Sequence, residues 1–190
     1  EMCIRDRKQT KDCFSEVMSQ AYNHEINEVQ SPLIDSKFSK FVHYHRNAVN
    51  QMIDYNRDFR LTLFGFSTLM NKYLIQSHDG NVIESPQDLW MRVACFLHMN
   101  THDLRDASVL EKVKETYDLI SQGYLSQASP TLFNCGTKKP QLLSCFLTSG
   151  DDSTNGIMKL ATGLAHISKH SGGIGFHWNV RASGDPVKGI

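Results

Sequence analysis

Apolar residues in the first two thirds of the chain recur every three or four positions, the spacing that places them on one face of a helix. Three such faces precede residue 75, and they comprise Phe14, Val17, Met18, Ala21 and Tyr22, then Phe38, Phe41, Val42, Val49 and Met52, then Phe66, Leu69, Met70, Tyr73 and Leu74. Pro32 closes the first region, and Ser36 precedes the second. The pattern therefore predicts three helices in this part of the chain.

Two further helices have recognisable start or stop signals. In the fourth, Ser85 is a capping residue, Pro86 suits the first helical position and Asp88 completes an S-x-x-D capping box. Its apolar face comprises Leu89, Trp90, Val93, Ala94 and Leu97. The fifth helix is predicted over about 104–122, with Gly123 as its stop. Its inward residues are Ala107, Leu110, Val113 and Tyr117.

The character of the sequence changes near Gln127. Residues 128–141, ASPTLFNCGTKKPQ, are rich in Pro, Gly, Asn and Thr, which indicates a structured loop. The apolar run at 141–148 is flanked by polar residues and predicts a buried strand.

A capped helix follows this strand. Asp152 or Ser153 opens the helix, Gly172 and Gly173 end it, and 174–182 predicts another strand. The helical residues expected to face the core are Ile157, Leu160, Ala161, Leu164 and Ile167. Strand, helix and strand within about 40 residues predict a β-α-β unit of an α/β domain, so the chain is expected to be mostly helical and to end in the start of an α/β fold.

The composition is that of an ordinary globular protein, with 40% hydrophobic residues, 21% charged residues and a formal net charge of zero. This balance indicates neither a nucleic-acid partner nor a membrane surface. The five cysteines contain no C-x-x-C pair, which favours a reducing, cytoplasmic setting. Residues 1–7 resemble a translated sequencing adapter, and we expect the chain to be a fragment of a longer protein.

Cys145 lies in the first predicted strand, where a lone cysteine usually serves as a small hydrophobic residue. A redox role requires a partner thiol, and Cys135 lies ten residues earlier, within reach across the predicted loop. In a regular strand Ser144 would face the side opposite to Cys145, so one of the two should be interior. The spacing alone leaves the structural and the redox interpretation open.

Several polar residues are candidates for binding an anion. Ser129 and Thr131 lie in the donor-rich loop, and residues 150–156, GDDSTNG, open a helix whose N-terminus attracts anions. Lys169 and Arg181 could hold a phosphate as charged donors. The alternatives are an ordinary turn, a helix cap and solvated surface charges.

Two histidine pairs have the i, i+4 spacing of a helical metal site: His98 with His102, and His166 with His170. Neither pair has the H-E-x-x-H motif or a third ligand nearby. The glycines of SGGIG at 171–175 match no phosphate-binding loop. We therefore expect no metal site in this chain.

Four segments taken together resemble one family: ASPTLFNCGTKKPQLLSCFL at 128–147, DDSTNGI at 151–157, HISKHSGGIGF at 166–176 and VRASG at 180–184. They are similar to the N-terminal half of the large, catalytic subunit of class I ribonucleotide reductase, of the eukaryotic and viral type. The earlier stretches YNRDFRLTLFGFSTLMNKYLI and PQDLWMRVA are similar to the helical domain that precedes the barrel in that family. The resemblance covers nearly everything after Arg7.

The resemblance implies a fold and a reaction. The family has a ten-stranded α/β barrel in which a thiyl radical starts the reduction of ribonucleoside diphosphates, and two further cysteines supply the electrons as they become a disulfide. Cys145 matches the first cysteine of that pair, whereas its partner and the radical cysteine are expected after Ile190. Ser129 and Ser144 match residues that contact the substrate, chiefly at its diphosphate end.

The resemblance also implies regulation and partners. The matched effector site binds allosteric nucleoside triphosphates, ATP and deoxynucleotides, and its residues here would be Asp152, Ser153, Thr154, Lys169, Arg181, Lys188 and Gly189. The expected partners are a second large subunit, a metal-containing small subunit that supplies the radical, and thioredoxin or glutaredoxin as reductant. No cofactor is expected to bind this fragment directly, and the product would serve DNA synthesis.

These inferences divide the chain into the expected artefact at 1–7, an N-terminal helical domain at 8–125 and the truncated start of the catalytic barrel at 126–190. Alone, the chain is expected to be inactive. The alternatives are a catalytically degenerate homologue that only binds nucleotides, and a small helical metal-binding protein that uses the paired histidines.

Overall fold

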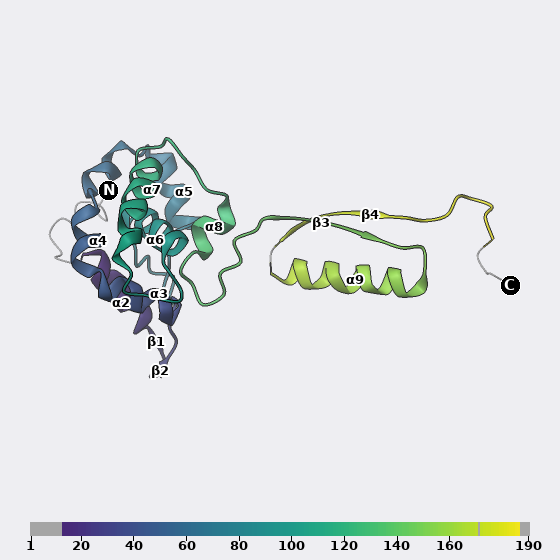
Figure 1. Cartoon of the computed structure of the whole chain (residues 1–190), viewed down its shortest axis with the longest axis horizontal. Coiled ribbons are helices and arrows are strands. Elements are labelled where there is room, and N and C mark those ends of the chain that lie inside the picture. Colours follow the sequence, from purple (N-terminus) through teal and green to yellow (C-terminus); the bar gives the residue numbers. More distant parts are fainter. Residues whose placement is uncertain (1–12, 171, 187–190) are drawn as a thin grey trace. The chain divides into compact units, whose positions relative to one another are not determined.

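The computed structural model describes residues 13–170 and 172–186 (Figure 1). The chain divides after Leu142 into two compact units, here called the helical unit (13–142) and the β-α-β unit (143–186). No helix among the described residues is both long and apolar enough to cross a membrane.

The helical unit contains the helices that the periodicity predicts. In chain order its elements are α2 (Phe14–Tyr22), β1 (Glu25–Ile26), β2 (Val29–Gln30), α3 (Ser36–Tyr44), α4 (Arg46–Met52), the 3-10 turn η1 (Tyr55–Arg60), α5 (Leu63–Lys72), α6 (Pro86–His98), the 3-10 turn η2 (Ala107–Val109), α7 (Leu110–Ser121) and α8 (Ser129–Asn134). The strands β1 and β2 form a short antiparallel hairpin. The five predicted helical segments are therefore confirmed.

Two of these segments differ in detail from the prediction. The second predicted helix is divided at His45, which is the C-cap of α3 and the N-cap of α4. His45 is buried, and its Nε2 lies 3.2 Å from the carbonyl oxygen of Leu104. The fifth helix begins only at Leu110, because Asp106 first caps the turn η2 by accepting a hydrogen bond from the backbone N–H of Ser108. As a result, Ala107 is exposed, and the expectation that it points inward is wrong.

A short helix replaces part of the predicted loop. Residues 129–134 form α8, which begins with a proline in its first turn, a position where the missing N–H costs nothing. This helix packs against α6. The helical unit consequently extends beyond residue 125, where the sequence placed the domain boundary.

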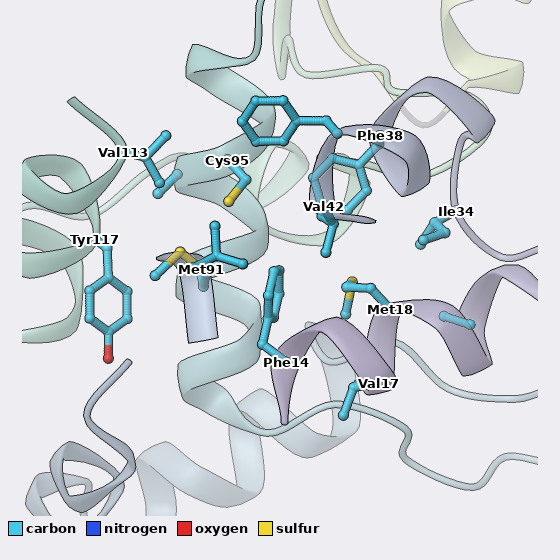
Figure 2. Close-up of a cluster of buried hydrophobic side chains, with 14 of the residues drawn as sticks. Phe14, Val17, Met18, Ile34, Phe38, Val42, Met91, Cys95, Val113 and Tyr117 are labelled. Atoms are coloured by element: carbon cyan, nitrogen blue, oxygen red, sulfur yellow. The ribbon is translucent and has the colours of Figure 1, made fainter. Parts of the chain in front are cut away.

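Apolar side chains from α2, α3, α4, α6 and α7 meet in the larger core of the helical unit (Figure 2). The buried members drawn and labelled there are Phe14, Val17, Met18, Ile34, Phe38, Val42, Met91, Cys95, Val113 and Tyr117. The rings of Phe38 and Phe96 meet edge to face with their centroids 6.1 Å apart. Burial of this apolar surface is the main force that holds the helices together.

The β-α-β unit has the predicted order of strand, helix and strand. Its elements are β3 (Cys145–Gly150), α9 (Thr154–Lys169) and β4 (Gly173–Trp178), and α9 lies along the strand pair (Figure 1). The strands are parallel, with Cys145 opposite Gly173 and Gly150 opposite Trp178. The predicted β-α-β unit is therefore confirmed, with both strands offset by a few residues from the predicted runs.

Alternation along β3 divides its side chains between two faces. Phe146 and Gly150 belong to the face that α9 covers, because a Cβ atom on Gly150 would lie 2.9 Å from the side chain of Leu160 and one on Gly172 would lie 2.9 Å from the ring of Phe146. The other face carries Cys145, Leu147 and Ser149, and none of these three is buried.

The expectation of a buried strand is wrong for the described residues, since the side chain of Leu147 is 90% exposed. A helix covers only one face of the two-stranded sheet. On α9 itself Leu160 is buried, while the predicted core residue Ala161 is exposed. The remaining predicted core residues of α9 are half-buried, namely Ile157, Leu164 and Ile167.

Candidate nucleotide and redox site

Cys145 is the exposed cysteine in the described part of the chain, where Cys13 is half-buried and Cys95 and Cys135 are buried. It begins β3, on the face of the sheet opposite to α9. Its Sγ lies 3.6 Å from the hydroxyl of Ser144, which donates a hydrogen bond to it. Ser144 lies just before the regular strand, and its side chain is a neighbour of Cys145. The strand alternation predicts that one of the two is interior, but Ser144 is half-buried and Cys145 is exposed.

Two glycines of β4 keep the surface beside this thiol free of side chains. In the parallel register Gly173 lies next to Cys145, and Gly175 lies next to Leu147. A Cβ atom on Gly173 would lie 3.0 Å from the Ser144 carbonyl oxygen, and one on Gly175 would lie 2.8 Å from the Leu147 side chain. The sequence matches these glycines to no binding loop, and in the structure both positions have the close approach to a neighbour that glycine permits.

The two buried cysteines are chemically unlike Cys145. Burial raises the pKa of Cys135 to about 11, only partly offset by the nearby charge of Arg92, and burial also raises the pKa of Cys95. A thiol reacts as its thiolate, so both remain protonated and unreactive at neutral pH. The burial of Cys135 therefore disfavours it as a redox partner for Cys145.

This contrast predicts a selective alkylation pattern. With iodoacetamide at pH 7.5, Cys145 of the folded chain should react at least about a hundredfold faster than Cys135 or Cys95, because those thiols are inaccessible and protonated. Peptide mass spectrometry over a time course measures each rate. In urea the three rates should converge, which is the control. Equal labelling of Cys135 and Cys145 in the folded chain would contradict the assignment.

The beginning of α9 brings together several of the residues expected to bind an effector. Ser153 caps the helix, as its hydroxyl accepts the N–H of Gly156 at 3.0 Å. The Asp152 carboxylate accepts hydrogen bonds from Nε and from the backbone N–H of Arg181, at 2.6 and 3.2 Å. These hydrogen bonds lower the pKa of Asp152, so it remains ionised at neutral pH. Thr154 is the first helical residue.

The other expected effector residues are not part of this group. Lys169 ends α9, which is 16 residues long, so it lies about 22 Å along the helix from Thr154. Lys188 and Gly189 lie outside the described residues, as does the expected artefact at 1–7. The described cluster therefore consists of a carboxylate, a helix N-terminus and one guanidinium.

Ser129, expected to contact substrate, lies in the helical unit as the first residue of α8. It is exposed, and its hydroxyl lies 2.9 Å from the hydroxyl of Tyr73. Thr131 is buried instead and donates to the Leu142 carbonyl oxygen at 3.3 Å, which makes it a structural residue. The helical periodicity places Tyr73 on an apolar helix face and does not predict this hydroxyl contact.

The paired histidines make other contacts in the structure. The helix α6 ends at His98, whose Nε2 lies 2.7 Å from the hydroxyl of Thr116, so His102 does not share a helical face with it. The Nδ1 of His170 lies 2.9 Å from the carbonyl oxygen of His166. The residues that the structure describes contain no group of three or more His, Cys, Asp or Glu side chains arranged to hold a metal ion.

Comparison with known protein families places each unit separately. Residues 59–140 match the family described as "Ribonucleotide reductase, all-alpha domain", and residues 143–190 match "Ribonucleotide reductase, barrel domain". The boundary between the two matches coincides closely with the division into the helical and the β-α-β units.

The chain is also similar to individual curated proteins. It is 40% identical over 185 residues to the ribonucleoside-diphosphate reductase large chain of Cryptosporidium parvum, covering 96% of this chain and 22% of that protein. It is 42% identical over 187 residues to the large chain of Schizosaccharomyces pombe and 41% identical over 186 residues to the large subunit of Danio rerio, each match covering 96% of this chain and 22% of the relative. The chain thus spans about a fifth of the length of these relatives.

Proposed function

Because the chain belongs to the ribonucleotide reductase large-subunit family, with an all-alpha domain followed by the start of the barrel domain, we propose that its parent protein reduces ribonucleoside diphosphates to deoxyribonucleoside diphosphates for DNA synthesis. The observation that carries this proposal is the exposed thiol of Cys145, beside Ser144 and on a strand face that two glycines keep clear. The proposal places this thiol chemistry in the cytoplasm, where thiols are kept reduced.

The proposed role of Cys145 is to supply half of the reducing equivalents. At C2′ of the ribose the C–O bond breaks, a C–H bond forms and the hydroxyl leaves as water. Two thiols lose two electrons and two protons as they become one disulfide, which balances the reaction. Cys145 is one of these thiols, and the second comes from elsewhere in the parent protein. Thioredoxin or glutaredoxin then reduces the disulfide by thiol–disulfide exchange.

Two hydroxyls are proposed to hold the substrate. Ser129 and Ser144 are both uncharged donors, suited to the oxygens of a diphosphate. Ser144 precedes Cys145 directly, so a diphosphate bound there would hold the ribose close to the thiol. The radical that starts the reaction would be supplied by a separate metal-containing small subunit.

The start of α9 is proposed to bind the allosteric effector, a nucleoside triphosphate such as ATP or a deoxynucleotide. Asp152 is suited to accept a hydrogen bond from a ribose hydroxyl, and it holds the Arg181 guanidinium close to the helix N-terminus, where phosphates are favoured. Lys169 contributes from the far end of α9, along which we propose that a second large subunit packs. On that helix Met158 is 60% exposed, which leaves apolar surface for such a partner. Lys188 and Gly189 complete the proposed set.

Replacing Arg181 with glutamine should weaken effector control. With the full-length parent and its small subunit, we expect the effector concentration for half-maximal stimulation to rise about tenfold, because one charge-assisted contact to phosphate is lost. Unstimulated turnover should change little. Arg105→Gln is the matched control, since Arg105 lies in the helical unit over the ring of Tyr44. An unaltered effector response in the Arg181 variant would remove Arg181 from the site.

The function itself is tested by assaying deoxynucleotide formation. The full-length parent, its small subunit, a ribonucleoside diphosphate and a thioredoxin system should together yield the deoxyribonucleoside diphosphate. Nucleotide binding without any product would instead favour the catalytically degenerate homologue. Neither outcome depends on the isolated chain, which we propose to be inactive.

A further inference from the structure

A fully buried ion pair lies in the helical unit, outside the residues proposed above to act on nucleotides. The side chains of Arg92, on α6, and Glu84, just before it, are both 0% exposed. Nε and Nη2 of Arg92 donate to the two carboxylate oxygens of Glu84, at 2.8 and 2.6 Å. This two-point arrangement is the strongest and most directional form of a salt bridge.

The remaining donors of the same guanidinium hold α8. Nη1 of Arg92 donates to the Cys135 carbonyl oxygen at 2.5 Å, and Nη2 also donates to the Leu132 carbonyl oxygen at 3.2 Å. These carbonyls belong to the last turn and the C-cap of α8, where backbone carbonyls lack N–H donors from their own helix and where a cation is favoured by the helix dipole. Glu84 is fixed in turn, because it accepts the N–H of Ile75 at 2.9 Å.

The chain after α8 turns directly over this ion pair. Gly136 follows the helix with φ of +75°, and a Cβ atom there would lie 3.0 Å from the ring of Phe38 and 3.3 Å from Cγ of Arg92. The backbone then continues with the Gly136 carbonyl accepting the N–H of Asp35 at 2.8 Å. The C-terminal end of α8 is therefore fixed by contacts with α6 and with the start of α3.

A helix of six residues is too short to be stable by itself, so its position depends on such contacts. A buried ion pair is a weak source of stability, because desolvation offsets most of the attraction, and the better-attested use is to specify one arrangement. Here the arrangement that it specifies is that of α8, whose first residue is Ser129.

We propose that Arg92, held by Glu84, is a positioning residue for substrate binding, which sets the place of the Ser129 hydroxyl by fixing α8. The inference rests on the proposed function, in which Ser129 contacts the diphosphate end of the substrate. Arg92 itself does not touch substrate in this proposal. The hydroxyl of Tyr73 contacts the same Ser129 hydroxyl directly, at 2.9 Å.

Steady-state kinetics of the full-length parent with its small subunit test the proposal. In Arg92→Lys, an ammonium cannot serve the carboxylate and both carbonyls at once, so α8 should loosen. We expect KM for the ribonucleoside diphosphate to rise about tenfold while kcat changes less than about twofold, since a contact made equally in ground and transition states is lost. The double variant Glu84→Met/Arg92→Met, which leaves no buried charge, should fold and show the same rise in KM.

Arg57→Lys is the matched control. Arg57 is a mostly buried arginine of the same unit, and its guanidinium donates to Asp118 and Ser121 of α7, at 2.7 and 2.5 Å. This control should lower Tm without changing KM. Hydrogen exchange gives a second measurement, in which the amides of Thr131, Leu132 and Cys135, bonded within α8, should exchange about tenfold faster in the Arg92 variants only.

The outcomes separate the two proposals. If the Arg92 variants lower Tm but leave both KM and the exchange of α8 unchanged, Arg92 is only structural and the inference is overturned. If the wild-type parent makes no deoxynucleotide, the proposed function fails, and exchange at α8 in the Arg92 variants still decides whether Arg92 orders this helix.

Discussion

Replacing Cys145 with serine in the full-length parent should abolish multiple turnover. Serine keeps the size and the strand, but its hydroxyl cannot form a disulfide, so the two electrons for each product have no donor. We expect steady-state formation of deoxynucleotide to fall by at least about a thousandfold. The measurement is conversion of a radiolabelled ribonucleoside diphosphate in the presence of the small subunit and a thioredoxin system. Ribonucleotide binding, measured separately, should change by less than about threefold.

The control for this experiment is Cys13→Ser. Cys13 is half-buried and lies next to Asn50, whose side-chain amide donates to its sulfur at 3.1 Å, and this contact is within the helical unit. A serine there preserves an acceptor, and turnover should stay within about twofold of wild type. Sustained turnover by the Cys145 variant would show that this thiol is not one of the redox pair, whatever the family of the chain.

Local sequence signals predicted local structure well. Ser85 and Asp88 form the predicted capping box of α6, with the Ser85 N–H donating to the Asp88 carboxylate at 2.7 Å. Caps of this kind are specified within four residues, so a single sequence contains all the information they need. The parallel pairing of β3 with β4 followed from a strand, helix and strand order that permits little else.

The contacts that the sequence did not predict join distant residues. Ser129 meets Tyr73, which lies 56 positions away, and Arg92 meets the Cys135 carbonyl across 43 positions. The position of Arg92 in the apolar run WMRVACF was a signal, since a charged residue in a buried stripe requires a partner. No local pattern, however, identifies Glu84 as that partner.

The exposure of β3 could not be predicted from its composition. An apolar run such as LLSCFL is typical of a strand covered on both faces, yet a helix covers one face only in the β-α-β unit. The sequence of a strand reports the surface that it can bury, and burial itself depends on which elements pack against it. Leu147 is predicted to be buried but is exposed, so it identifies a surface suited to further packing.

Replacing Phe38 with alanine should remove much of the stability of the helical unit. Phe38 is 0% exposed and lies in the larger core (Figure 2). Its ring packs edge to face against Phe96, and a Cβ atom on Gly136 would lie 3.0 Å from it. Loss of a buried aromatic ring leaves a cavity and costs about 3–5 kcal/mol, out of a total of about 5–15 kcal/mol for a typical domain. Urea denaturation followed by far-ultraviolet circular dichroism should show a lower midpoint with a similar slope.

Phe64→Ala provides the matched comparison, because it removes the same atoms from a side chain that is 83% exposed. In the present chain this change should alter the free energy of unfolding by no more than about 0.5 kcal/mol. The difference between the two variants isolates burial from intrinsic propensity, since both residues lie in helices, Phe38 in α3 and Phe64 in α5. Equal losses in the two variants would mean that the packing around Phe38 does not stabilise the unit.

The ring of Phe38 also packs close to Gly136, in the turn after α8. Its loss should therefore speed hydrogen exchange of the α8 amides as well. This result would connect the core of the helical unit to the proposed substrate contact at Ser129.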